Sequence, residues 1–429
     1  MEEALSLIYN QFLRNPSVVI DSRKVKPGDL FFALKGDRFD GNRFAAEVIA
    51  SGAAMAVVDD SSLINEKGCI WVEDTLKALQ LLANRYRNSL NVIVIGITGS
   101  NGKTTTKELI AKTLSENYNV LATEGNLNNH IGVPLTLLKL KKETQIAVIE
   151  MGANHPGEID ALCKIAEPGY GIITNIGRAH LEGFGGFEGV IRTKTEMYRY
   201  IRQSGGQIFF NVDNPLLKKH IDGIKSVTYG AGENAEIRGD LLASYPFVKI
   251  LFSTNDNIYA VESKLSGNYN FENILAAICI GIYFKVPPEG IKRAIESYLP
   301  SNNRSQLVRT SNNLLIMDAY NANPSSMDAS IKYFAGSDYP QKVLILGEML
   351  ELGDDSIPEH QKLVKLVDEL GFREVYFVGD SFKNAGVTEQ WFHSNEILTE
   401  YFKANPLKGK TILIKGSRGN ALEKIADCL

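Results

Sequence analysis

Short apolar runs rich in β-branched residues alternate, through most of the 429 residues, with stretches whose apolar positions recur every three or four residues. The first pattern predicts buried strands and the second predicts amphipathic helices. Their alternation favours parallel sheets joined by right-handed helical crossovers. We therefore predict an α/β fold of three domains: a small N-terminal α/β domain (residues 1–88), a central P-loop ATPase-like parallel sheet (91–303) and a C-terminal Rossmann-like α/β domain (305–429).

A glycine-rich loop follows the apolar run at residues 93–97 and precedes a helical pattern from about residue 106 to 116. Loop amides and a helix N-terminus that point to one place bind phosphate. Lys103 would contact the outer phosphates, and the Thr104 hydroxyl would bind Mg²⁺. The glycines are spaced GxxGxxGKT, with Ile97 where the usual motif has glycine, and an ordinary βα turn is the alternative. The predicted loop comprises Thr98, Gly99, Ser100, Asn101, Gly102, Lys103, Thr104 and Thr105.

Two later strands of the central segment end in polar residues. Glu150 ends the run at 146–149, and His180 follows the run at 171–174. The carboxyl ends of parallel strands face the same crevice, and a carboxylate beside a phosphate loop suits Mg²⁺. Judged by its chemistry alone, His180 is a hydrogen-bonding or capping residue more often than a metal ligand. Lys194 lies in a helical pattern at residues 189–201, where a solvated surface lysine is the ordinary interpretation.

Polar loops also mark the flanking segments. Residues 21–29, which include Ser22 and Arg23, and residues 35–42 follow strand-like runs and could hold a diphosphate ligand. In the last segment, residues 318–326, 347–353 and 415–419 follow predicted strands, and residues 421–427 have a helical pattern. Solvated loops are the alternative in each case.

Composition narrows the class of protein. The net charge of −4 gives no excess of basic residues that would indicate a nucleic-acid-binding protein. The four cysteines are scattered, which argues against a zinc site or a disulfide framework and fits a reducing compartment. No apolar run reaches the length of a membrane span, and the acidic start lacks the basic residues of a signal peptide. We expect a cytoplasmic enzyme without membrane insertion.

Taken together, these motifs resemble the Mur ligases, the ATP-dependent amide-forming enzymes of peptidoglycan precursor synthesis. The resemblance covers all three segments and lies in the phosphate loop, Glu150, the Ala179-His180 pair, and Lys194-Thr195-Glu196. It extends to residues 125–134, 150–159, 270–273 and 318–324, and to Arg304. It implies a monomer that uses ATP and Mg²⁺ to join D-alanyl-D-alanine to a UDP-N-acetylmuramoyl-tripeptide through an acyl phosphate.

The resemblance also implies a role for each residue. Lys103, Glu150, His180 and Lys194 would be catalytic. Thr104, Glu150, His180 and Lys194, the lysine as a carbamate, would form the metal site. ATP would be bound by the phosphate loop with Asn270, Asn273, Arg304 and Asp318. The substrates would be bound by Ser22, Arg23, Asn126, Asn129, Tyr320, Asn321 and Asn323.

Two other functions stay open at this point. One is a related ligase, either the sister enzyme that adds the third peptide residue or a folylpolyglutamate synthase-like ligase. The sister enzyme typically carries Asp-Asn-Pro-Arg in its last domain, and this chain does not contain that motif. The other is a non-catalytic nucleotide switch or motor. A switch would need far fewer polar loops at strand ends than this chain carries.

Overall fold

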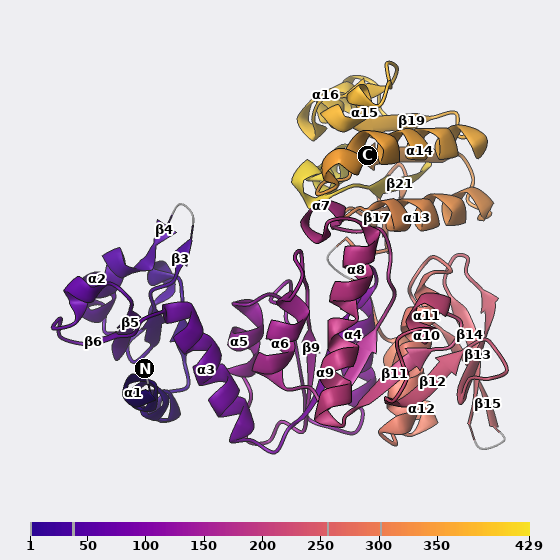
Figure 1. Ribbon diagram of the computed structural model, residues 1–429. Helices are drawn as coiled ribbons and strands as arrows, with labels where there is room; N and C mark the ends of the chain where they lie inside the picture. Colours follow the sequence, from indigo (N-terminus) through magenta and orange to yellow (C-terminus); the bar gives the residue numbers. More distant parts are fainter. Residues whose placement is uncertain (1, 37–38, 255–256, 301–302) are drawn as a thin grey trace. The chain divides into compact units, whose positions relative to one another are not determined.

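The computed structural model describes residues 2–36, 39–254, 257–300 and 303–429. Figure 1 shows the helices and strands, coloured along the sequence. The contacts within the structure divide the chain into two units. Unit 1 comprises Met1–Gly96, Tyr118–Gly152 and Glu158–Tyr170, and unit 2 comprises Ile97–Asn117, Ala153–Gly157 and Gly171–Leu429. Each unit is described by itself.

Unit 1 begins with a four-stranded parallel sheet in the order β1-β2-β5-β6. Helix α3 is stabilised at its start by Asp74, which accepts a hydrogen bond from Lys77 N. Its apolar face, which includes Leu79 and Leu82, is buried. The elements are α1 (Glu2–Arg14), β1 (Val18–Val19), β2 (Leu30–Phe32), β3 (Lys35–Gly36), β4 (Phe39–Asp40), α2 (Ala45–Ala50), β5 (Met55–Val58), β6 (Cys69–Trp71) and α3 (Thr75–Asn88).

The rest of unit 1 carries strands and helices of the central segment: β8 (Val120–Ala122), α5 (Gly132–Leu137), β9 (Ile146–Glu150) and α6 (Glu158–Ala166). β7 (Ile93–Thr98) and β10 (Tyr170–Ile173) each cross the division between the units. They belong to a nine-stranded sheet in the order β15-β14-β13-β12-β11-β10-β7-β9-β8.

Unit 2 begins with the end of β7 and helix α4 (Lys103–Leu114). β11, β12 and β13 pair in parallel, but only β11 was predicted as a strand, and β13, β14 and β15 form an antiparallel edge that the sequence pattern did not indicate. The predicted helix at residues 189–201 is two helices that meet at Thr195. The elements are α7 (Leu181–Phe184), α8 (Phe187–Lys194), α9 (Glu196–Ser204), β11 (Gln207–Asn211), α10 (Pro215–Lys218), β12 (Lys225–Gly230), β13 (Ile237–Ala243), β14 (Lys249–Thr254), β15 (Asn257–Glu262), α11 (Asn270–Tyr283) and α12 (Pro288–Glu296).

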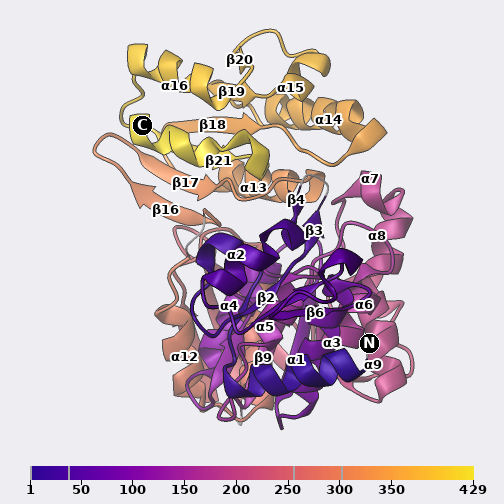
Figure 2. The ribbon, with the colours of Figure 1, turned by 90° about the vertical axis from the view of Figure 1, so that its left-hand side faces the viewer.

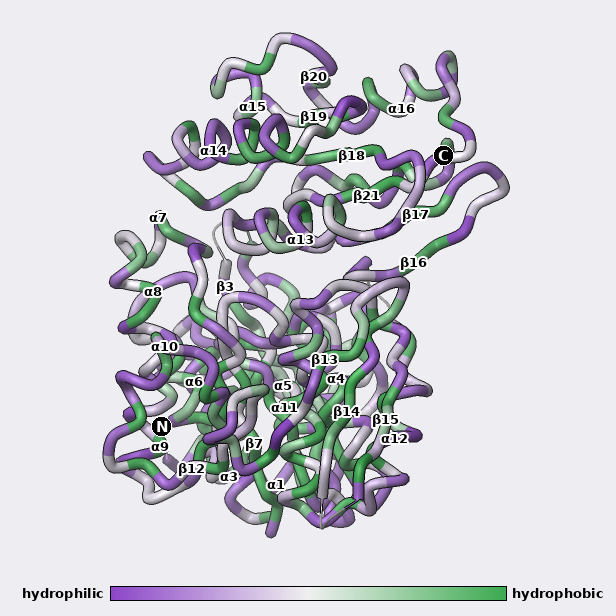
Figure 3. The backbone as a smooth tube through the Cα atoms, turned by 90° about the vertical axis from the view of Figure 1, so that its right-hand side faces the viewer, coloured by the Kyte–Doolittle hydropathy of each residue, from purple (hydrophilic) through white to green (hydrophobic). Residues whose placement is uncertain are grey.

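The C-terminal part of unit 2 contains a six-stranded sheet in the order β16-β17-β21-β18-β19-β20 (Figure 2). The middle residues of β18 and β21 are hydrophobic, whereas hydrophobic and hydrophilic residues alternate along α14, as expected of a helix that covers a sheet (Figure 3). The predicted helix at residues 421–427 is a 3₁₀ helix, Leu422–Cys428. The other elements are β16 (Gln306–Arg309), β17 (Leu314–Asp318), α13 (Pro324–Gly336), β18 (Lys342–Gly347), α14 (Ser356–Glu369), β19 (Val375–Val378), α15 (Asp380–Asn384), β20 (Trp391–Phe392), α16 (Asn395–Ala404) and β21 (Thr411–Lys415).

Candidate active site

The glycine-rich loop lies between the end of β7 and the start of α4, as the sequence predicts. Gly102 has a φ of +77°, a left-handed conformation that glycine adopts without steric cost. A Cβ atom at this position would lie 2.4 Å from Asn273 Oδ1, so the close approach of α11 also requires glycine. The loop therefore turns directly into a helix N-terminus, which is the arrangement that binds phosphate.

Lys103 is the first residue of α4 and folds back over the loop. Its Nζ donates to Gly99 O at 2.7 Å and to Ser100 O at 3.1 Å. Thr104 and Thr105 are buried in the first turn of the helix. The ammonium group thus lies against two carbonyl groups of the loop, next to the N-terminus of α4.

Asn270 and Asn273, the pair expected at the nucleotide, stand in the first turn of α11 and are both buried. Asn273 Oδ1 accepts from Thr106 Oγ1 at 3.0 Å, and Asn273 Nδ2 donates to Asn270 Oδ1 at 2.9 Å. Asn270 in turn donates to Ser266 O. This chain of bonds ties the start of α11 to α4 directly behind the phosphate loop.

His180 follows β10 in the left-handed region, with a φ of +53°, immediately before α7. Its Nδ1 contacts the Glu351 carboxylate, and its ring packs edge-on against Phe184. The hydrogen bond from His180 holds the pKa of Glu351 below its ordinary value. The structure thus gives His180 a carboxylate partner.

Lys194 ends α8 and is buried, with only 1% of its surface exposed. The alternative of a solvated surface lysine is therefore wrong. Its Nζ lies 5.2 Å from the centroid of the Phe184 ring. Glu196, the other member of the Lys-x-Glu motif, is also buried and accepts a hydrogen bond from Gly157 N at 2.7 Å.

Glu150, in unit 1, ends β9 and is 2% exposed. One carboxylate oxygen accepts from Asn128 Nδ2 at 2.8 Å, and its backbone N–H donates to Thr123 Oγ1 at 2.9 Å. Asn128, which the sequence reasoning did not single out, lies between the predicted substrate residues Asn126 and Asn129. Both of these are exposed, and the Asn129 side chain accepts from Ile131 N and Gly132 N before α5.

In the N-terminal sheet, Ser22 and Arg23 lie in a short 3₁₀ turn after β1. Arg23 makes two bonds of 2.9 Å to the Asp21 carboxylate while its side chain is 85% exposed. These bonds lower the pKa of Asp21 to about 2. The guanidinium is therefore oriented by Asp21 and accessible to an anion.

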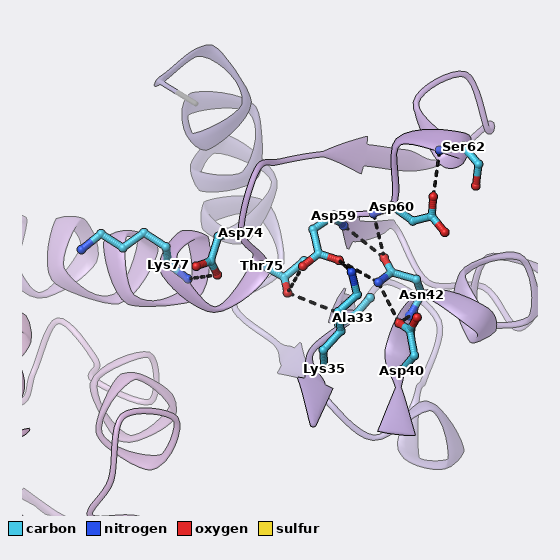
Figure 4. A network of polar contacts seen from close by, with 10 residues as sticks. All are labelled: Ala33, Lys35, Asp40, Asn42, Asp59, Asp60, Ser62, Asp74, Thr75 and Lys77. Carbon is cyan, nitrogen blue, oxygen red and sulfur yellow. Dashed lines mark hydrogen bonds and ion pairs between the residues drawn. The ribbon is translucent and has the colours of Figure 1, made fainter. Parts of the chain in front are cut away.

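The second polar loop of this sheet is organised by a buried asparagine (Figure 4). Asn42 Nδ2 donates to Asp40 Oδ1 at 2.8 Å and to Asp59 Oδ1 at 2.7 Å, and Asn42 Oδ1 accepts from Asp59 N at 3.1 Å. Lys35 pairs with Asp59 at 2.9 Å. Asp37 and Arg38 of this predicted loop lie outside the described residues.

In the C-terminal part, Asp318 at the end of β17 pairs with the buried Lys415 at 2.5 Å. Two guanidinium groups stand over the ring of Tyr320, Arg304 at 3.8 Å and Arg418 at 5.5 Å. The Arg418 contact was not anticipated, because residues far apart in sequence make it. Asn321 Oδ1 accepts from the next backbone N–H.

Asn323 joins the predicted substrate loop to the phosphate loop. It caps α13 through Ser326 N and donates from Nδ2 to Asn101 Oδ1 at 2.8 Å. The structure thus brings one expected substrate residue and one expected nucleotide residue into direct contact. Among the described residues, no group of three or more His, Cys, Asp and Glu side chains has a metal-binding arrangement.

Family models match three stretches of the chain. The Mur ligase family, catalytic domain, matches residues 16–87; the Mur ligase middle domain matches 97–281; and the Mur ligase, glutamate ligase domain, matches 303–418. The chain belongs to the Mur ligase family.

The similar proteins point to one branch of that family. The UDP-N-acetylmuramoyl-tripeptide–D-alanyl-D-alanine ligase of Bacillus subtilis is 37% identical over 423 residues, 95% of this chain and 92% of the relative. The ligase of the same name from Escherichia coli is 35% identical over 96% of this chain and 93% of the relative.

Solved structures of MurF are also similar to this chain. MurF from Acinetobacter baumannii has a TM-score of 0.86 and 34% identity, covering 96% of this chain and 93% of that chain. MurF from Thermotoga maritima in complex with ADP has a TM-score of 0.85 and 28% identity, covering 96% of both chains. The predicted α/β fold class and the predicted family are confirmed, whereas the exact bounds of the three domains stay a prediction.

Proposed function

We propose that this chain joins D-alanyl-D-alanine to UDP-N-acetylmuramoyl-tripeptide with cleavage of ATP to ADP and phosphate, giving the pentapeptide precursor of peptidoglycan. The observation that carries the proposal is full-length similarity to ligases of that name, in a chain whose phosphate loop has the geometry for a nucleotide. The rival of a non-catalytic switch has no comparable support.

The reaction divides into two transfers. The terminal carboxylate of the tripeptide attacks the γ-phosphorus of ATP, so an acyl phosphate forms and ADP leaves. The amino group of D-alanyl-D-alanine then attacks the acyl carbon, loses a proton, and displaces phosphate as the amide forms. The protein contributes by positioning the reactants and by offsetting charge on the transferring phosphoryl group.

Lys103 and the loop amides perform the second of these tasks. The ammonium group lies 2.7 Å from Gly99 O, and a short movement would direct it to the outer phosphates. Mg²⁺, when bound, supplies further positive charge there. Thr104 and the buried Glu150 offer the oxygen atoms that Mg²⁺ prefers, which fits their assignment to the metal site.

Lys194 serves this site as a carbamate. Its amine adds to carbon dioxide and releases a proton, which replaces a cation by an anionic oxygen pair. An unmodified ammonium group would repel Mg²⁺, whereas a carbamate would bind it. The burial of Lys194 is compatible with this role, because the end of its side chain lies inside the protein and not in solvent. His180 completes the metal site, positioned by Glu351.

The remaining residues divide between the substrates. Ser22, Arg23, Asn126 and Asn129 bind the UDP-linked precursor, whose diphosphate suits the exposed Arg23 guanidinium. Asp318, Arg304, Asn270 and Asn273 bind the nucleotide, and Tyr320, Asn321 and Asn323 bind the dipeptide. We place the enzyme in the cytoplasm, where ATP and UDP-linked precursors are available, and as a monomer. Among the described residues, no helix is long and apolar enough to cross a membrane.

Phosphate release is the direct test. The purified chain is given ATP, Mg²⁺ and UDP-N-acetylmuramoyl-tripeptide, with D-alanyl-D-alanine, D-alanine or single L-amino acids as acceptor. Release that requires both the tripeptide and the D-dipeptide is expected. Release that instead requires a UDP-muramoyl-dipeptide and a diamino acid would identify the sister ligase.

A further inference from the structure

The segment that follows β10, residues 175–182, contacts the phosphate loop on one side; we call it the β10 strap. Asn175 accepts from Ser100 N through its backbone oxygen and from Asn101 N through Oδ1, both at 3.0 Å. Gly177 N donates to Ser100 Oγ at 2.9 Å, and this hydroxyl donates back to Gly177 O at 3.0 Å. Two amides of the loop are thus fastened to the strap.

Arg178 of the strap contacts two helices of the C-terminal part of unit 2, α13 and α14. Arg178 N donates to Ser325 Oγ, in the first turn of α13, at 2.8 Å. A Cβ atom at Gly177 would lie 2.9 Å from that hydroxyl, so the backbones approach as closely as glycine permits. The Arg178 guanidinium forms an ion pair of 3.1 Å with Glu359 of α14.

The ion pair between Arg178 and Glu359 differs from an ordinary surface ion pair because its carboxylate is buried. The Glu359 side chain is 6% exposed, and the Arg178 side chain is 40% exposed. A carboxylate withdrawn from water interacts more strongly with its cation than an exposed one does. Glu359 also pairs with Lys362 at 2.8 Å, so loss of Arg178 would leave the carboxylate with a partner inside its own helix.

We propose that Arg178 is a positioning residue, which holds the C-terminal part of unit 2 against the phosphate loop and thereby sets the affinity for the incoming dipeptide. The inference rests on the ligase activity proposed above. The acyl phosphate forms at the phosphate loop, and the acceptor amine must reach it with an alignment that a small displacement destroys. Arg178 directly follows Gly177, which is hydrogen-bonded to Ser100 of the loop.

A double-mutant cycle tests the ion pair. Arg178→Gln and Glu359→Gln, the double variant, and the exchanged pair Arg178→Glu with Glu359→Arg are compared with the unmodified chain. Each single variant should raise the KM for D-alanyl-D-alanine about tenfold, within the ~5–150-fold range of typical coupling between sites. The KM for ATP should change far less. The double Gln variant should be no worse than the worse single variant, and the exchanged pair should recover part of the affinity.

Lys365→Gln is the matched control, since Lys365 pairs with Glu369 on the same helix α14 with both side chains exposed. It should leave the KM unchanged. Effects that add in the double variant, or an unchanged KM in Arg178→Gln, would overturn the proposal. A fall in melting temperature together with a uniform loss of kcat would point to a merely structural role and would overturn it as well.

Hydrogen exchange with Mg-ADP separates this inference from the ligase activity. Mg-ADP should slow exchange at residues 318–326 in the unmodified chain, and this protection should weaken in Arg178→Gln while protection of the phosphate loop persists. An inactive unmodified chain would refute the proposed function, yet the exchange difference would still decide the role of Arg178. Equal protection in both proteins would refute that role.

Discussion

Lys103 begins a helix, and this position determines what its side chain must face. A cation at a helix N-terminus is unfavourable, because the unpaired N–H groups carry partial positive charge. Lys103 offsets this by donating to the Gly99 and Ser100 carbonyls. An anion at the same place would satisfy both the amides and the ammonium group, so the local electrostatics favour a phosphate.

Replacing Lys103 by alanine should reduce turnover at least ~10²–10³-fold, the usual cost of one lost contact to charge that develops during the reaction. Phosphate release under saturating substrates measures the effect. Lys112→Ala is the control, because Lys112 lies on the same helix and donates to the Ser297 carbonyl. A near-normal rate in Lys103→Ala would remove the phosphate loop from the mechanism.

Lys194→Ala should be almost inactive and partly rescued by short carboxylates. Alanine removes the proposed carbamate and leaves space of similar size inside the protein, where a small carboxylate can bind. Arg192→Ala, at an exposed position of the same helix, should keep full activity and change the free energy of unfolding by no more than ~0.5 kcal/mol. Full activity in Lys194→Ala would refute the catalytic assignment.

At the scale of elements, the strands that flank the site were predictable because they are buried on both faces. The runs that became β9, β11 and β21 are continuous and apolar, and the structure places strands there. Helix α1 was not predicted, although its buried Ile8 and Phe12 are four residues apart, the spacing of an amphipathic helix. The break at Thr195 between α8 and α9 depends on packing, which periodicity does not show.

The loop after β18 depends on one buried histidine of α14. His360 Nε2 accepts from Met349 N at 3.0 Å, and Nδ1 lies 2.7 Å from Ser356 O. Burial lowers the pKa of His360 from its ordinary 6.5. The unfolded chain therefore binds the proton more readily. The stabilising contribution is complete above pH ~6.5 and is lost as the pH falls through the folded pKa.

Chemical denaturation between pH 8 and pH 5 should accordingly show a falling free energy of unfolding below pH ~6.5. His360→Gln should flatten this dependence and cost about 1 kcal/mol at neutral pH, because glutamine replaces the histidine bonds imperfectly. The exposed His130→Gln is the control and should preserve the slope. An unchanged slope in His360→Gln would show that other groups cause the pH dependence.

At the scale of the whole molecule, the sequence motifs predicted the local structure of the phosphate loop, but not what surrounds the candidate site residues. The phosphate loop was predicted from its glycines and lysine because the motif is local. The contacts of Arg178, Glu359 and Arg418 were not predicted, since they join residues that are distant in sequence. The burial of Lys194 could not be inferred either, because a helical pattern does not reveal what packs against it.

The division of ligands between the two units gives the last prediction. Mg-ADP should slow hydrogen exchange at residues 98–105 and 318–323, which belong to unit 2, and leave residues 21–29 of unit 1 unchanged. The UDP-linked tripeptide should protect residues 21–29. At a ligand concentration of 100 Kd, the stabilisation is ~2.7 kcal/mol, so amides that exchange only through release of the ligand should slow up to ~100-fold.

Arg23→Ala tests this assignment directly. The Arg23 side chain is exposed, and among the described residues its guanidinium bonds to Asp21. The variant should lose protection by the UDP-linked tripeptide, raise the KM for that substrate, and retain protection by Mg-ADP. Arg14→Ala, at the exposed end of α1, should behave like the unmodified chain. If Arg23→Ala weakened Mg-ADP binding and left the UDP-linked tripeptide bound as before, the nucleotide and the precursor would have been assigned to the wrong units.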